Sequence, residues 1–135
     1  MNRLDKSNLL FDLPRPVIFA HRGASRFAPE NTLAAFNLAV QQGSDAIELD
    51  AKLTADGHIV VFHDQTLERT TSATGKIRER TLSELKGLDA GGHFDISYQN
   101  DRIPTLEEVF EAVSQRIFVN VELTNYASPY DRLPE

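Results

Sequence analysis

Three carboxylates stand within or near the ends of apolar runs that have the composition of strands. Glu48 and Asp50 alternate with apolar residues in one run, and Glu122 stands near the end of a later one. Carboxylate oxygens that converge in a chain without cysteine suit a hard divalent cation, Mg²⁺ or Ca²⁺, with Mn²⁺ as a further candidate. Glu48 and Asp50 alone are also compatible with a solvated strand face, so the prediction of a metal site depends on Glu122 joining them.

Two histidines and an arginine follow the same kind of apolar run. His21 and His63 have imidazoles whose ordinary pKa lies near neutrality, so one could accept a proton while the other donates one. The guanidinium of Arg22 fits phosphate oxygens. Either histidine alone is just as compatible with a hydrogen-bonded residue at a strand end, and an isolated arginine is more often part of a structural ion pair. His58 and His93 are expected to be structural or solvated. Taken together with a metal, however, they predict a metal-assisted phosphodiesterase.

Strands and helices alternate around these residues. The apolar periodicity predicts strands at Val17–Ala20, Asp45–Leu53, Ile59–Phe62 and Ile117–Leu123, a helix from Asn31 or Thr32 to Gly43, and another over Leu106–Gln115. Polar residues at strand ends and alternating helices are typical of a TIM-type (β/α) barrel, whose sites gather at the carboxyl ends of the strands. The predicted fold class is therefore α/β.

The connection at 55–58 carries the turn sequence Ala-Asp-Gly-His. It is too short for the crossover that parallel neighbours need, so the strands on either side are predicted to form a hairpin with His63 near Asp50. Residues 65–100 are more polar, and Thr81 with Glu84 has the capping-box pattern of a short helix. We expect this stretch to be a small excursion within one domain that covers 1–135.

Composition excludes several classes of protein. The formal net charge of -6 argues against a general binder of nucleic acid or anionic membranes, which needs excess Lys and Arg. The absence of cysteine excludes disulfides, thiolate metal sites and thiol nucleophiles. No apolar run approaches the length of a membrane span, and no signal-peptide pattern is visible, so we expect a cytoplasmic protein without a transmembrane segment.

Several short motifs in this order resemble the glycerophosphodiester phosphodiesterase family. They are His21-Arg22-Gly23, Pro29-Glu30-Asn31-Thr32, Glu48-Leu49-Asp50, Thr54-Ala55-Asp56-Gly57, His63-Asp64 with Leu67 and Arg69-Thr70-Thr71, Ile103-Pro104-Thr105-Leu106-Glu107-Glu108, and Asn120-Val121-Glu122. The resemblance implies a TIM-type barrel and hydrolysis of glycerophosphodiesters to glycerol 3-phosphate and an alcohol. It implies an insertion domain at about 65–100.

The resemblance also assigns roles to individual residues. Glu48, Asp50 and Glu122 resemble the ligands of the divalent cation. His21 and His63 resemble the general acid/base pair, and Arg22 resembles the phosphate-contacting arginine. One departure concerns position 124, where many members carry a lysine and this chain has Thr124, which cannot supply the charge.

A second departure is length, since a TIM barrel has eight strands and about 250 residues. We therefore expect a fragment, the N-terminal half of the barrel with about four strands, and Ser128 and Pro129 have the pattern of a further helix start. A half-barrel exposes strand edges and apolar surface, which predicts a homo-oligomer. Two alternatives remain open: a lyase-like phosphodiesterase that releases a cyclic phosphate, and a catalytically inert half-barrel.

Overall fold

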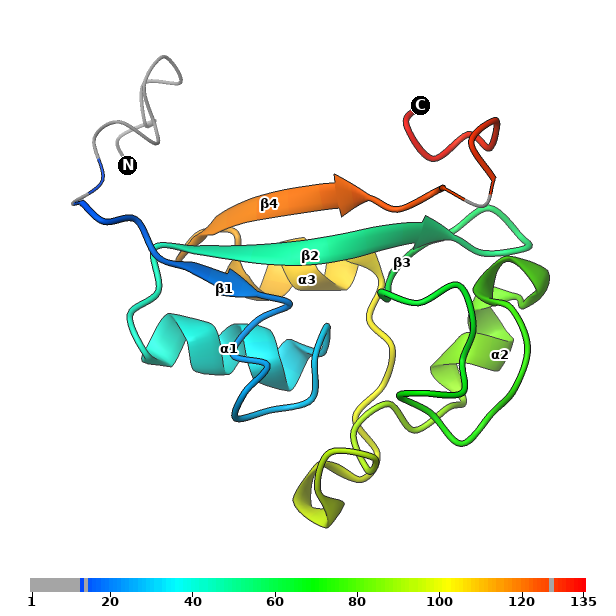
Figure 1. The fold of residues 1–135 in the computed structure, drawn as a ribbon, viewed down its shortest axis with the longest axis horizontal. Coiled ribbons are helices and arrows are strands. Elements are labelled where there is room, and N and C mark those ends of the chain that lie inside the picture. The colour runs from blue at the N-terminus through cyan, green and yellow to red at the C-terminus, as the bar shows by residue number, and fades with distance from the viewer. Residues whose placement is uncertain (1–12, 14, 127) are drawn as a thin grey trace.

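The fold is organised around one long central strand. The computed structural model describes residues 13, 15–126 and 128–135. The central strand, β2 (Ala46–Leu53), pairs in parallel with β1 (Phe19–His21) and with β4 (Phe118–Leu123), and antiparallel with β3 (Ile59–Val61). Ala51 pairs with both Val61 of β3 and Leu123 of β4, so β3 lies along the same edge of β2 as β1, and β4 occupies the other edge (Figure 1).

The short turn at 55–58 forms the predicted hairpin. The Gly57 amide donates to Thr54 O at 3.1 Å, and Gly57 has a φ of 82°, a left-handed conformation that glycine adopts without steric cost. The hairpin register places Phe62 opposite Asp50, with the Phe62 amide donating to Asp50 O at 2.9 Å. His63 therefore lies one residue beyond Phe62, the residue that faces Asp50. The prediction that His63 lies near Asp50 is confirmed to within one residue.

Two helices pack on one face of the sheet. Thr32 caps the start of α1 (Leu33–Gln41), because its hydroxyl accepts from the Ala35 amide. Thr105 and Glu108 form a reciprocal capping box at the start of α3 (Leu106–Val113), which ends two residues earlier than predicted. The apolar side chains between the two helices and β2 form the main core; they include Phe36, Ala39, Ile47, Leu49, Val61, Val109 and Val113.

Residues 65–100 carry a second, smaller core of their own. Leu67, Ile77, Leu85 and Ala90 pack against Val60 and Phe62 at the hairpin, together with Ile103. The excursion holds one short helix, α2 (Leu82–Lys86), with the predicted Thr81–Glu84 capping box, and two 3₁₀ turns, η1 (Ile77–Glu79) and η2 (Ile96–Tyr98). It is a loop-rich excursion that follows the end of β3 (Figure 1).

The described residues hold the four predicted strands; β1, β2 and β4 run parallel, and β3 runs antiparallel to β2. Helices alternate with these parallel strands, which is the local arrangement of a (β/α) barrel. Residues 128–135 form turns rather than the predicted helix start. None of the helices in the described part of the chain is long and apolar enough to cross a membrane. Closure of a half-barrel and oligomerisation remain predictions.

Candidate active site

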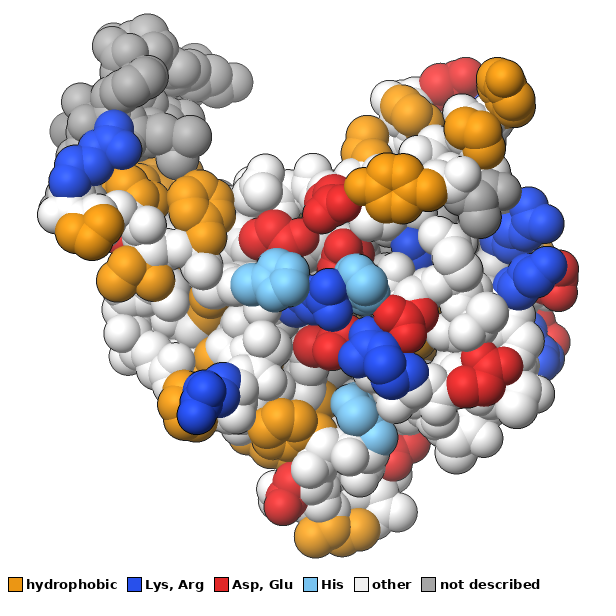
Figure 2. Space-filling view, in the orientation of Figure 1, with side chains coloured by type: hydrophobic (Ala, Val, Ile, Leu, Met, Phe, Trp, Pro, Cys, Tyr) orange, Lys and Arg blue, Asp and Glu red, His pale blue; other side chains and the backbone are white. Residues whose placement is uncertain are grey.

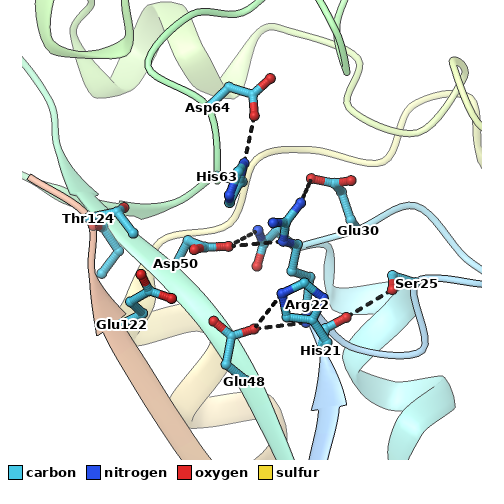
Figure 3. A network of polar contacts seen from close by, with 12 residues as sticks. His21, Arg22, Ser25, Glu30, Glu48, Asp50, His63, Asp64, Glu122 and Thr124 are labelled. Carbon is cyan, nitrogen blue, oxygen red and sulfur yellow. Dashed lines mark hydrogen bonds and ion pairs between the residues drawn. The ribbon is translucent and has the colours of Figure 1, made fainter. Parts of the chain in front are cut away.

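The three predicted carboxylate ligands converge on one face of the sheet. Glu48 and Asp50 lie on the same face of β2 because side chains alternate along a strand, and Glu122 lies beside them on β4 as the register partner of Asp50. Each residue offers an oxygen, and these oxygens all lie within 4.8 Å of one another. Figure 3 shows the three carboxylates side by side across the two strands. The sheet therefore brings Glu122 close to Glu48, although the two residues are 74 positions apart in the sequence.

Burial makes this cluster costly without a counter-charge. Asp50 is only 1% exposed, and burial together with the neighbouring Asp50 charge raises the pKa of Glu48 above its usual value. Glu48 Oε1 and Asn31 Oδ1 are buried and have no hydrogen-bond partner. Buried oxygens without a donor are uncommon in folded proteins. A hard divalent cation fits this donor set, because it would bind the free oxygens and offset the repulsion between the acids.

The turn after β1 places a backbone donor on this cluster. Arg22 and Gly23 both have positive φ, 58° and 80°, and the Arg22 amide donates to Glu48 Oε2 at 3.1 Å. A Cβ on Gly23 would lie 2.7 Å from the Cβ of Ala35 in α1, so the close approach of turn and helix requires glycine. The imidazole of His21, which is 67% exposed, has its Nε2 3.8 Å from Glu48 Oε2.

The Arg22 side chain lies between two acids. Its Nη1 donates to Glu30 Oε1 at 3.2 Å, and its Nε lies 3.5 Å from Asp50 Oδ2 without hydrogen-bond geometry. Asn31 holds the same Asp50 oxygen, donating from Nδ2 at 2.9 Å. Arg22 thus stands at the edge of the carboxylate cluster, where it could turn toward an anion, but its charge is already paired.

His63 is held by a chain of ion pairs. Its Nδ1 lies 2.6 Å from Asp64 Oδ1, so Nδ1 carries the proton of this bond and Nε2 is left for proton transfer. Arg69 binds both oxygens of Asp64, and both oxygens of Glu30 as well. Hydrogen bonding from Arg69 lowers the pKa of Asp64 to about 2 and also lowers the pKa of Glu30.

The charges of this face do not balance. Figure 2 shows acidic, basic and histidine side chains gathered at the centre of one face. The acids of the site are Glu30, Glu48, Asp50, Asp64 and Glu122, and its fixed cations are Arg22, Arg69 and Lys52. With neutral histidines the acids exceed the cations by two charges when all are ionised, which is the charge that one divalent cation would neutralise.

The other two histidines lie away from the cluster. His58 is exposed in the hairpin turn, with Nε2 3.9 Å from Asp56 Oδ2. His93 lies in the 65–100 excursion, where burial lowers its pKa and Glu30 and Arg69 are among its charged neighbours. The structural or solvated roles expected for His58 and His93 remain predictions.

Four further residues belong to the site, and sequence reasoning had given them no role. Glu30 and Arg69 stood in the motifs, but nothing in the sequence indicated that they bind each other. Lys52 stood on the acidic face of its strand and is 4% exposed. Tyr126 had no signal at all; its hydroxyl donates to Glu122 Oε1 at 2.6 Å.

Comparison with known proteins identifies the family of this chain. The model of the glycerophosphoryl diester phosphodiesterase family matches residues 21–131. A glycerophosphodiester phosphodiesterase of Caldanaerobacter subterraneus subsp. tengcongensis is 47% identical over 122 residues, which cover 90% of this chain and 50% of that protein. The chain spans about half the length of the curated relatives it matches.

Solved structures show the same likeness. The crystal structure of a glycerophosphodiester phosphodiesterase from Agrobacterium tumefaciens str. C58 has a TM-score of 0.77 at 50% identity, covering 78% of this chain and 46% of that one. An Oleispira antarctica phosphodiesterase, solved in complex with the product sn-glycerol-3-phosphate, has a TM-score of 0.78 at 50% identity, covering 80% of this chain and 44% of that one.

Proposed function

This chain belongs to the glycerophosphoryl diester phosphodiesterase family, and we propose that its site serves the metal-dependent hydrolysis of a glycerophosphodiester to glycerol 3-phosphate and an alcohol. The observation that carries the proposal is the convergence of Glu48, Asp50 and Glu122 within 4.8 Å, with a buried oxygen left unpaired. The product held by the Oleispira relative supports glycerol 3-phosphate as the phosphate-bearing product.

The three carboxylates would hold one divalent cation, Mg²⁺ or Ca²⁺, with Mn²⁺ as a further candidate. The bound cation supplies polarisation of a phosphoryl oxygen. Asn31 and the Arg22 amide keep Asp50 and Glu48 oriented, because each donates to one carboxylate oxygen and leaves the other free. Arg22, at the edge of the carboxylate cluster, would bind a phosphate oxygen.

His21 and His63 would move the protons. One accepts the proton of the attacking water as the new P–O bond forms, and the other donates to the alkoxide as the ester P–O bond breaks. His63 is suited to either role because Asp64 holds Nδ1 and leaves Nε2 for transfer. His21 is exposed, and Ser25 Oγ donates to its carbonyl at 2.9 Å, which holds the backbone behind the imidazole.

The finer architecture belongs to the same proposal. Three parallel strands with alternating helices support the N-terminal part of a TIM-type barrel, and the separate small core of 65–100 supports an insertion.

The outer edge of β4 has no strand partner among the described residues, which supports a homo-oligomer of this chain. Light scattering on a size-exclusion column would give the mass per particle; a monomer at all concentrations would contradict the oligomer.

The test of function is turnover by the 135-residue chain. Glycerophosphocholine is incubated with the chain and Mg²⁺, Ca²⁺ or Mn²⁺, and products are followed by ³¹P NMR. We expect metal-dependent glycerol 3-phosphate that disappears with chelator and in His21→Ala and His63→Ala, while Glu111→Gln on the exposed side of α3 behaves as wild type. A cyclic phosphate as the final product would favour the lyase, and no turnover with any metal would favour the inert half-barrel.

A further inference from the structure

Lys52 and Thr124 form a rung of the sheet directly beyond the carboxylates. Asp50 and Glu122 are register partners on β2 and β4, and Lys52 and Thr124 each stand two residues further along, on the same face. The Lys52 ammonium donates to Thr124 O at 2.9 Å and to Thr124 Oγ1 at 2.6 Å. Thr124 directly follows the last residue of β4 and lies beside β2 (Figure 3). The ammonium is therefore next to the acidic cluster and on the side where the strands end.

Lys52 differs from the other two cations of the site in its partners. Arg22 is ion-paired with Glu30 and Asp50, and Arg69 with Glu30 and Asp64. In the described part of the chain, Lys52 makes no ion pair, and its two hydrogen bonds go to neutral oxygens of Thr124. An ammonium has three N–H donors, so one remains after Thr124 is satisfied.

A role in joining two strands does not explain why the residue at position 52 carries a buried charge. Burying an ammonium on neutral acceptors costs free energy that a hydroxyl or an apolar side chain at the same position would avoid. Lys52 is 4% exposed, and the negative charges of Asp50, Asp64 and Glu122 act on it. In surroundings of low dielectric constant, a charge acts on its neighbours over several Å without direct contact.

We propose that Lys52 supplies the unpaired positive charge that holds the phosphate group of the substrate against the carboxylate cluster. Thr124, which follows β4, carries no charge. Lys52 on β2 would supply the positive charge at this end of the cluster instead. Lys52 is thus a positioning residue for an oxyanion of the phosphate class rather than a strand-to-strand tie. The inference rests on the proposed function, because it requires a phosphate-bearing ligand above the cluster.

The two possible roles of Lys52, a positive charge for the phosphate or a hydrogen-bonded link between two strands, predict different binding behaviour. If Lys52 acts through its charge, Lys52→Met should bind Mg²⁺ as tightly as wild type or more tightly, because a neighbouring cation repels the metal. The same variant should bind glycerol 3-phosphate roughly tenfold more weakly. A mere tie would loosen the β2–β4 geometry and weaken both ligands together. Lys52→Arg keeps the charge and should retain phosphate affinity.

The control variants separate the two roles further. Thr124→Val removes the hydroxyl acceptor but keeps the ammonium, so it should lower the melting temperature while glycerol 3-phosphate affinity stays within about threefold of wild type. The double variant Lys52→Met, Thr124→Lys moves the charge across the rung, and it should recover most of the affinity that Lys52→Met loses.

The experiment is isothermal titration of Mg²⁺, and then of glycerol 3-phosphate in saturating Mg²⁺, into each metal-free variant, with circular dichroism to confirm folding. Selective loss of phosphate binding in Lys52→Met, recovered in the double variant, supports the proposal. Equal loss of both ligands, or no loss of phosphate binding, overturns it while the proposed function stands. Failure of the wild-type chain to bind either ligand overturns both.

Discussion

Asp64 and Arg69 form a two-point ion pair, with Nε 2.7 Å from Oδ2 and Nη2 2.9 Å from Oδ1. The same Asp64 Oδ1 lies 2.6 Å from Nδ1 of His63. One carboxylate thus links the arginine to the histidine, and Arg69 continues the link to Glu30 beside Arg22.

Acid stability should depend on Asp64. Arg69 lowers the pKa of Asp64 to about 2, so its ionised form stabilises the fold above the unfolded-state pKa near 4. This contribution is lost as pH falls from about 4 to about 2, and solvent screening limits it to about 1 kcal/mol. Arg69→Met should remove it, so that the variant and wild type differ by about 1 kcal/mol at pH 7 and converge near pH 2.

Urea unfolding at pH 7, 5, 3 and 2 measures that difference. Arg26→Met, an exposed arginine in the β1–α1 loop, is the matched control and should follow wild type at every pH. A difference between Arg69→Met and wild type that stays constant down to pH 2 would show that Arg69 acts through packing and not through Asp64.

Asp64→Asn should lower turnover without affecting the metal. The amide cannot hold the His63 imidazole as an anion does, so we expect kcat for glycerophosphodiester hydrolysis to fall on the order of a hundredfold. Mg²⁺ affinity should not change, because Asp64 is outside the carboxylate cluster. Steady-state kinetics with titrated Mg²⁺ checks both, and Asp95→Asn on the exposed excursion is the control. Unchanged kcat would remove His63 from the proposed acid/base pair.

Alanine substitutions at Gly23 and Gly43 distinguish the cost of backbone strain from the cost of steric contact. Both have positive φ, 80° and 77°, but a Cβ at Gly43 meets nothing within 4 Å, whereas one at Gly23 would lie 2.7 Å from Ala35. We expect Gly43→Ala to cost about 1 kcal/mol of unfolding free energy and Gly23→Ala roughly 3 kcal/mol. Gly23→Ala should also weaken Mg²⁺ binding, since the turn carries the Arg22 amide.

Chemical denaturation gives the two free energies, and titration calorimetry gives the metal affinity. Equal costs for the two substitutions would mean that α1 moves away from the turn at little expense. In that case the close contact would not fix the position of His21 and Arg22.

Tyr126→Phe tests a contact that only the structure reveals. The Tyr126 hydroxyl donates to Glu122 Oε1 at 2.6 Å and so competes with a cation for that oxygen. Because Tyr126 is 73% exposed, we expect its loss to tighten Mg²⁺ binding only slightly, by about twofold to fivefold. Tyr130→Phe, at a side chain that is 98% exposed, is the matched control. Weaker binding in Tyr126→Phe would mean that the phenol orients Glu122 for the metal.

Much of the sheet could be predicted because its determinants are local. Alternation along β2 predicted the shared face of Glu48 and Asp50, and the length of the turn at 55–58 required β3 to be antiparallel. The capping-box pattern of Thr81 and Glu84 marked a true helix start, because its hydrogen bonds join residues three positions apart.

The parts of the site that escaped prediction depend on contacts between distant segments. Lys52 meets Thr124 only through the β2–β4 register, across 72 positions, and Arg69 meets Glu30 across 39. No local pattern encodes such pairs. The turns at 128–135 were mistaken for a helix start, since Ser and Pro have the same local preferences in turns.

The most direct test is titration of Mg²⁺ into the metal-free chain, compared with Asp50→Asn and with Glu111→Gln. The proposed site predicts saturable binding of one ion per chain, tightened by glycerol 3-phosphate, lost in Asp50→Asn and retained in Glu111→Gln. No saturable binding, or binding that Asp50→Asn leaves intact, would contradict the assignment of Glu48, Asp50 and Glu122 as a metal centre.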